Sequence, residues 1–302
     1  MKIDTILWAT DGSQEAELAL GYAKYLAGLT GAGIIGLHVI PLPGGLFFEA
    51  LREKDASFDE WQKGIEAQAE DRFADAKKEL EESGIPFEGV LVRGEPAEEI
   101  IAFAERRKAG LIVMGKRGHS LLEKVVVGSE TAKVLRGSRV PVLAAKRDKP
   151  FDGGAITRII IPVDLSDEAE SAFMYALDLA ELTGAEVTAV YALRLDMYAQ
   201  DIPAGALDIV IRESYSELAK TASKFSKGYE ESRDVKLSRP VATDIVHGIS
   251  PALSISQYAK ENDADLIVIN THGRTGIERF VLGSVTERLI PESPCSVIAL
   301  KP

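Results

Sequence analysis

Residues 6–17, ILWATDGSQEAE, and residues 159–170, IIIPVDLSDEAE, carry one pattern in the two halves of the chain. Each is an apolar run that ends in aspartate, with serine two positions later. A Leu-Thr-Gly-Ala stretch follows each at identical spacing, at residues 29–32 and 182–185. Self-similarity along a whole chain fixes an architecture more firmly than local propensity does. The sequence therefore predicts two copies of one domain.

The length of 302 residues suits two domains, each able to bury its own core. Residues 146–155, KRDKPFDGGA, are charged and then rich in proline and glycine, as a linker would be. We expect an N-terminal domain over residues 1–148 and a C-terminal domain over residues 155–302. The short linker favours packing of the two about a pseudo-two-fold axis, and a further homodimer could form.

Short strands rich in Ile, Val and Leu alternate with longer segments of helical period. In the first repeat we predict strands at residues 5–9, 33–40, 87–93, 111–114 and 140–145. This alternation is typical of a parallel sheet covered by helices. The predicted fold class is α/β, with a mainly parallel five-stranded sheet and helices on both faces in each domain.

Capping residues predict where several helices begin and end. Ser13 is expected to cap the first helix and Gly31 to end it, with Ser166 and Gly184 doing the same in the second repeat. A further helix is expected over residues 96–108, where proline suits the first turn.

A glycine-rich segment follows the fourth predicted strand of each repeat. Glycines between a buried strand and a helix let the backbone approach a ligand, and the N–H groups at the helix start favour an anion. The two copies read Gly115-x2-Gly118-x9-Gly128-Ser129 and Asn270-x2-Gly273-x9-Gly283-Ser284. In sheets of this kind, ligands bind beyond the carboxyl ends of the strands, where the strand order reverses. Both segments therefore predict phosphate sites.

Composition excludes several classes of function. A net charge of −12 and a pI near 5.0 oppose nucleic acid or an anionic membrane as the main partner. We identify neither a membrane span nor a signal peptide, and expect a cytoplasmic protein. Cys295 is the one cysteine, and its apolar setting predicts an inert core thiol. Histidine and cysteine show no metal-ligand spacing, so no metal site is predicted.

Residues 271–276, THGRTG, and 281–288, VLGSVTER, resemble the signature segment of the universal stress protein family. The resemblance covers nearly all of both repeats and implies two tandem Rossmann-like domains. Members with the Gly-x2-Gly-x9-Gly-Ser/Thr pattern bind ATP, so the resemblance implies ATP as the cofactor. Mg²⁺ could accompany it through the phosphate oxygens.

The resemblance also implies roles for residues of the first repeat. Asp11 would hold the adenosine side, Val39 would offer its backbone to adenine, and Gly115 would lie against the ribose. The phosphates would be cradled by Gly118, Gly128 and Ser129. Lys116 and Arg117 could add charge to the phosphates or could simply be solvated.

The second repeat keeps most of this pattern, in Asp164, Gly273, Gly283 and Ser284. Asn270 departs from it by placing a side chain where the ATP-binding members have none. Asparagine tolerates a left-handed backbone, so the turn could survive while close approach to the sugar is lost. Ala192 takes the position of Val39. We therefore expect the N-terminal site to be filled more readily.

Other residues near the sites allow a purely structural interpretation as well as a functional one. His38 is expected to be a hydrogen-bonded core group rather than a base, while His119 and His272 flank their glycines on opposite sides and share no role. The apolar tip at residues 43–48 could be a lid, although packing between repeats or subunits is favoured.

The predicted function is an adenine-nucleotide-binding stress regulator with no evident catalytic residues. A nucleotide-independent adaptor is the alternative, and a slow ATPase is a further one.

Overall fold

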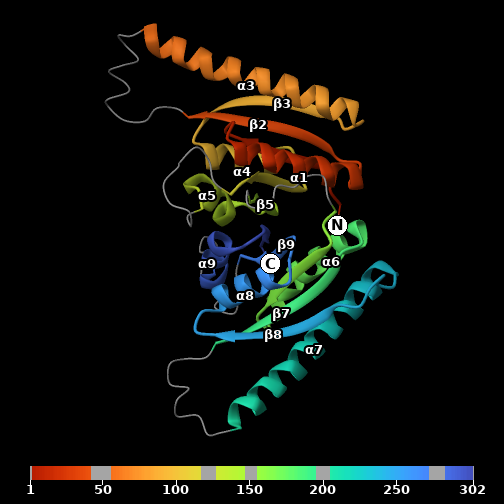
Figure 1. Ribbon diagram of the computed structural model, residues 1–302. Coiled ribbons are helices and arrows are strands. Elements are labelled where there is room, and N and C mark those ends of the chain that lie inside the picture. Colours follow the sequence, from red (N-terminus) through yellow and green to blue (C-terminus); the bar gives the residue numbers. More distant parts are fainter. Residues whose placement is uncertain are drawn as a thin grey trace. The chain divides into compact units, whose positions relative to one another are not determined.

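The computed structural model describes residues 2–41, 56–116, 127–146, 155–194, 205–271 and 283–301. The chain divides into two compact units that follow the two repeats, and many elements of each are labelled in Figure 1. The first repeat contains β1 (Thr5–Thr10), α1 (Gln14–Thr30), β2 (Gly33–Pro41), α3 (Ala56–Glu82), β3 (Phe87–Gly94), α4 (Pro96–Arg106), β4 (Leu111–Gly115), α5 (Ser129–Gly137) and β5 (Val142–Ala145). The second contains β6 (Arg158–Val163), the 3-10 turn η1 (Asp167–Ala169), α6 (Glu170–Thr183), β7 (Glu186–Arg194), α7 (Ala206–Arg233), β8 (Ala242–Gly248), α8 (Pro251–Glu261), β9 (Leu266–Asn270), α9 (Ser284–Glu292) and β10 (Ser296–Leu300).

Each repeat builds one five-stranded sheet from parallel pairs, which confirms the α/β prediction. The strand order is β3-β2-β1-β4-β5 in the first repeat and β8-β7-β6-β9-β10 in the second. From β1 the chain moves outward to β2 and β3, and then returns to β4 on the other side. Because such crossovers are right-handed, α1 and α3 cover one face while α4 and α5 cover the other.

The predicted strands are confirmed within two residues at each end. The largest difference is β5, which begins at Val142 rather than at residue 140. Pro141 has no N–H to give to the sheet, and Ser138 Oγ donates to Val140 O at 2.7 Å, so these residues form a turn instead. The helix predicted over residues 96–108 ends at Arg106, and Lys108 has left-handed backbone, with φ of 52°.

The cap prediction is confirmed in the first repeat and wrong for one residue of the second. Ser13 Oγ accepts from the N–H of Ala16 at 3.2 Å, and Gly31 and Gly184 end their helices in left-handed conformation. Ser166 precedes η1 but its side chain makes no cap bond there, and its hydroxyl instead donates to Asp164 Oδ1 at 2.5 Å. The 3-10 turn η1 therefore replaces the first helical turn.

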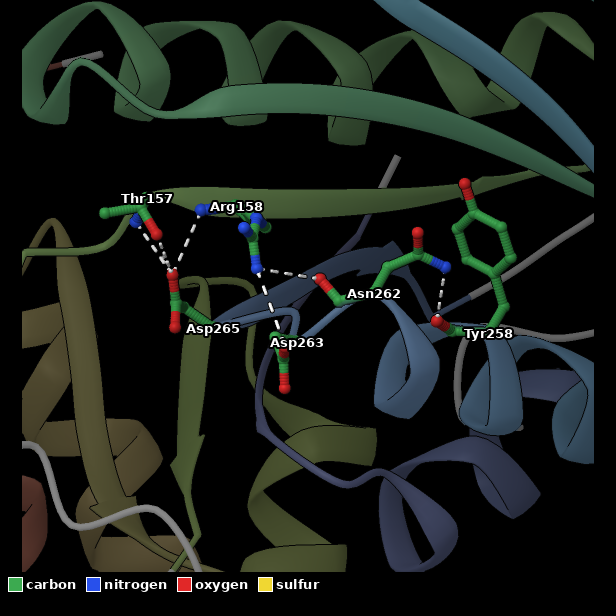
Figure 2. Close-up of polar contacts among 6 residues, drawn as sticks. All are labelled: Thr157, Arg158, Tyr258, Asn262, Asp263 and Asp265. Atoms are coloured by element: carbon green, nitrogen blue, oxygen red, sulfur yellow. Dashed lines mark hydrogen bonds and ion pairs between the residues drawn. The ribbon is translucent and has the colours of Figure 1, made fainter.

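The amino ends of the strands in the second repeat are held by one carboxylate. Asp265 Oδ2 accepts from Thr157 N at 2.8 Å, from Thr157 Oγ1 at 2.7 Å and from Arg158 N at 3.0 Å (Figure 2). The Arg158 side chain donates to Asn262 O at 3.3 Å. These contacts join the starts of β6 and β9 at the edge of the sheet opposite the predicted site.

Two glycines let α3 dock closely on the outer strands of the first repeat. Phe73 of α3 packs against Trp8 and Phe87, with ring centroids 6.3 and 6.0 Å apart. A Cβ at Gly36 or Gly89 would lie 2.8 or 2.7 Å from the Phe73 ring. Hydrogen side chains at these positions therefore make room for the aromatic ring.

Among the described residues, no helix has both the length and the apolar character that a membrane-spanning segment requires. Cys295 is buried, as predicted.

We expect Gly89→Ala to destabilise the first repeat by about 1–3 kcal/mol, because its methyl group would overpack Phe73. Gly28→Ala is the matched control, since nothing lies within 4 Å of a Cβ there in α1. That change should stabilise the repeat by about 0.5–1 kcal/mol through helix propensity. Both tryptophans, Trp8 and Trp61, belong to the first repeat, so urea denaturation followed by tryptophan fluorescence reports on it. Equal shifts of the two variants would contradict the packing role.

Candidate functional site

The carboxyl ends of β1 and β4 lie side by side where the strand order reverses. Ala9 of β1 is paired with Met114 of β4, so Asp11 and Gly115 follow at the same edge. Beyond β1 a tight turn is held by side chains: Asp11 Oδ1 accepts from Ser13 N at 2.9 Å and Thr10 Oγ1 accepts from Gly12 N at 3.1 Å. Asp11 is thereby held at the strand end with its side chain exposed.

Backbone hydrogen bonds hold together the two ends, or neck, of the glycine loop in the first repeat. Lys116 N donates to Ala145 O at 2.8 Å, and Gly128 N donates back to Lys116 O at 3.0 Å. Thr131 Oγ1 of α5 donates to Gly115 O at 2.9 Å. These bonds place the start of α5 beside the end of β4.

The second repeat has the same neck, built from the equivalent atoms. Thr271 N donates to Leu300 O at 2.8 Å, and Gly283 N donates to Thr271 O at 2.7 Å. Thr286 Oγ1 donates to Asn270 O at 2.8 Å. Gly118, Gly273, Arg117, His119, His272 and the apolar tip at residues 43–48 lie outside the described residues.

Helix α5 begins without a side-chain cap. Gly128 occupies the N-cap position, and no side chain there accepts from the first turn. Backbone N–H groups at such a helix start can bind an anion, which the helix dipole also favours. Glu130 joins this helix to α4, because its Oε2 accepts from Ala97 N at 3.1 Å. No sequence pattern indicates this contact, because it depends on how α4 and α5 pack.

A cavity of about 520 Å³ opens at this edge of the first repeat. It brings together five of the six site residues predicted there, which are Asp11, Val39, Gly115, Gly128 and Ser129. The base of the cavity includes buried His38 from β2. Its walls include residues that the sequence did not single out: Ile65, Gln68 and Arg72 from α3, and Pro96 and Ile100 from α4. The sequence shows the helical period of this segment, but it does not show which face of the helix turns toward the cavity.

Lys116, considered in the sequence as a phosphate contact, is buried, with 3% of its surface exposed. It is not among the residues that line the cavity.

The corresponding cavity of the second repeat is smaller, at about 260 Å³. Asp164, Asn270, Gly283 and Ser284 line it, together with Ala192 at the position of Val39. No residue of α7 contributes to its described lining.

Asn270 secures the smaller cavity with its own side chain. Its Oδ1 accepts from Ser171 Oγ at 2.8 Å, and its Nδ2 donates to the Glu168 carbonyl. These bonds hold η1 and the start of α6 against β9. The expected left-handed turn is absent: Asn270 and Gly115 both end a strand, and Asn270 is not among the residues with positive φ. Asparagine therefore serves here as a hydrogen-bonded latch rather than as a turn residue.

Within the described ranges, no three histidine, cysteine, aspartate or glutamate side chains gather as metal ligands would.

Comparison with known proteins agrees with the geometry. The universal stress protein family matches residues 2–146 and 155–301. The chain belongs to the universal stress protein family. A universal stress protein of Methanocaldococcus jannaschii is 36% identical over 48% of this chain and 81% of its own length. One from Mycolicibacterium smegmatis is 26% identical and aligns over 98% of this chain and 97% of its own.

Among solved structures, a universal stress protein from Archaeoglobus fulgidus has the same two-domain fold. Its TM-score is 0.70 at 24% identity, and the match covers 100% of this chain and 99% of that one. This likeness confirms the fold, and the family match over both repeats shows two tandem universal stress protein domains.

We expect Asn270→Asp to destabilise the second repeat by about 1–3 kcal/mol. The substitution keeps the size of the side chain but turns an acceptor toward the Glu168 carbonyl, leaving part-buried groups mispaired. Asn262→Asp is the matched control, because Asn262 Nδ2 also donates to a carbonyl, that of Tyr258 at 2.9 Å, but at an exposed helix end (Figure 2). The control should change stability by less than about 0.5 kcal/mol. Denaturation followed by circular dichroism measures both, and equal losses would argue against the latch.

Proposed function

We propose that this universal stress protein binds ATP or a related adenine nucleotide in the cavity of its first repeat. The observation that carries the proposal is the convergence of Asp11 and Val39 with Gly115, Gly128 and Ser129 around one space. About 520 Å³ lies within the range of roughly 300–1,000 Å³ typical of small-molecule sites. The uncapped start of α5 supplies backbone donors for phosphate.

Roles follow from the family resemblance and from position. Asp11 and Val39, at the ends of β1 and β2, would hold the nucleoside, with Gly115 against the ribose. Gly128 and Ser129 would hold phosphates together with Gly118. Any Mg²⁺ would be bound through the phosphate oxygens, with Asp11 as a candidate ligand.

The second repeat is the weaker candidate. Asp164, Gly273, Gly283 and Ser284 repeat the pattern, but the cavity has half the volume and Asn270 stands in it, held by Ser171 and Glu168. About 260 Å³ falls below the usual size of a small-molecule site. We infer that one nucleotide per chain is the expected occupancy.

Nucleotide binding would serve regulation rather than fast turnover. The described cavity lining contains one arginine, Arg72, whose guanidinium lies beside Gly12, just beyond the end of β1. Charge stabilisation at the transferred phosphoryl group is the main requirement of phosphoryl transfer. Slow hydrolysis therefore ranks below binding as a function.

We expect freshly purified protein, once denatured, to release about one adenine nucleotide per chain after incubation with ATP. Gly128→Asp should abolish this, because aspartate is a favourable N-cap that preserves α5 while its charge repels phosphate. Gly128→Asn is the matched variant, equal in shape and capping ability but uncharged, and should retain most of the binding. Chromatography of the released nucleotide gives both identity and stoichiometry.

The equivalent change in the second repeat separates the two sites. Gly283→Asp should leave the stoichiometry near one. Two nucleotides per chain from wild type would show that the second site tolerates Asn270. If wild type releases none after ATP is added, the proposal is rejected and the adaptor function is favoured. Multiple-turnover release of ADP would instead favour an ATPase.

A further inference from the structure

Arg72 projects from α3 into the wall of the N-terminal cavity. It shares a helix face with Ile65 and Gln68, and all three line the cavity. The next residue, Phe73, is buried against Trp8 and Phe87 and therefore fixes the position of this part of α3. The packing of Phe73 thus holds the Arg72 backbone in place beside the cavity.

The guanidinium of Arg72 lies directly over Gly12. A Cβ at Gly12 would be 2.1 Å from Nη1, 2.2 Å from Cζ and 2.5 Å from Nη2 of Arg72. Gly12 has φ of +79°, which glycine adopts readily. The equivalent residue of the second repeat, Leu165, has φ of +63°. Leu165 shows that this turn does not require glycine. In the first repeat, the missing side chain of Gly12 therefore matters for another reason: it leaves room for the Arg72 guanidinium.

Arg72 has no hydrogen-bond or ion-pair partner among the described residues. It is also the one lysine or arginine among the described lining residues. Partial desolvation raises the pKa of the nearby Glu17 carboxyl, and Arg72 opposes that shift. The planar guanidinium of Arg72 therefore faces the cavity with no close counter-ion among the described residues.

The second repeat lacks this arrangement. Buried residues occur at the same spacing in the two long helices, as Ala69, Phe73, Ala76 and Leu80 in α3 and as Leu218, Ala222, Phe225 and Tyr229 in α7. This alignment places Thr221 at the position of Arg72. The arginine and the glycine beneath it are therefore present together in the first repeat and both replaced in the second.

We propose that Arg72 binds the nucleoside half of the nucleotide in the N-terminal cavity. The assignment rests on the proposed function and on place: Gly12 adjoins Asp11 at the ends of β1 and β2, whereas the phosphate donors belong to the start of α5. A guanidinium packs well on the face of an aromatic base, and arginine does this better than lysine because it is planar and weakly hydrated.

The test compares ligands that share the nucleoside and differ in phosphates. Calorimetric affinities of nucleotide-free protein for ATP, AMP and adenosine would be measured for wild type and Arg72→Ala. We expect about a tenfold loss for each ligand, which lies between the effects of an exposed and a desolvated cation–π contact. Lys77→Ala removes an equal charge from an exposed position of α3 and should leave all three affinities unchanged.

A second variant moves the guanidinium without removing it. Gly12→Ala places a methyl group where Arg72 lies, and should weaken the three ligands in parallel. The thermal midpoint of ligand-free Arg72→Ala should stay close to that of wild type, since the described residues lose no hydrogen bond or ion pair and only the weaker attraction between Arg72 and Glu17. Unchanged affinities in both variants, or a loss confined to ATP, would overturn the proposal. If wild type binds none of the three ligands, the proposed function itself fails, which is a separate result.

Discussion

Parallel pairing between β1 and β4, and between β6 and β9, is the constraint on which both cavities depend. The connections leaving these neighbouring strands pass to opposite faces of the sheet, so no helix covers the point between their carboxyl ends. The glycine loop must return to this point, and the bond from Gly128 N to Lys116 O closes it there. The position of each cavity is thus set by topology, before any lining side chain is chosen.

On that shared frame the repeats differ mainly in what fills the space. In α3 the aromatic ring is Phe73, whereas the corresponding helix α7 has alanine at that position and Phe225 one turn further along. Phe225 packs on Phe173 of α6, with centroids 5.3 Å apart, rather than on a strand tryptophan. Exchanging large and small residues in this way preserves core volume, while it changes which side chains α3 and α7 present beside the cavity.

Patterns local in the sequence were predicted well, and contacts between distant segments were not. Apolar runs and glycines predicted the strands and the helix ends, because these depend on residues within one turn. Ser166 failed as a cap because Asp164 competes for its hydroxyl, a choice that capping preference does not contain. The role of Arg72 depends on Phe73 docking against Gly36 and Gly89, which are distant in sequence. The latch at Asn270 likewise needs Glu168 and Ser171, about a hundred positions earlier.

The two cavities therefore differ in which protein hydrogen bonds a ligand must break in order to enter. At the N-terminal site, Gly115 presents backbone with no side chain, so a ligand can approach it without displacing a bonded side chain. At the C-terminal site, the Asn270 amide already bonds Ser171 and Glu168, and displacing it would break two part-buried hydrogen bonds. Interactions that stabilise the start of α6 are thus the same ones that oppose a ligand. Duplication lets one copy keep an open site while the other converts the same position into internal structure.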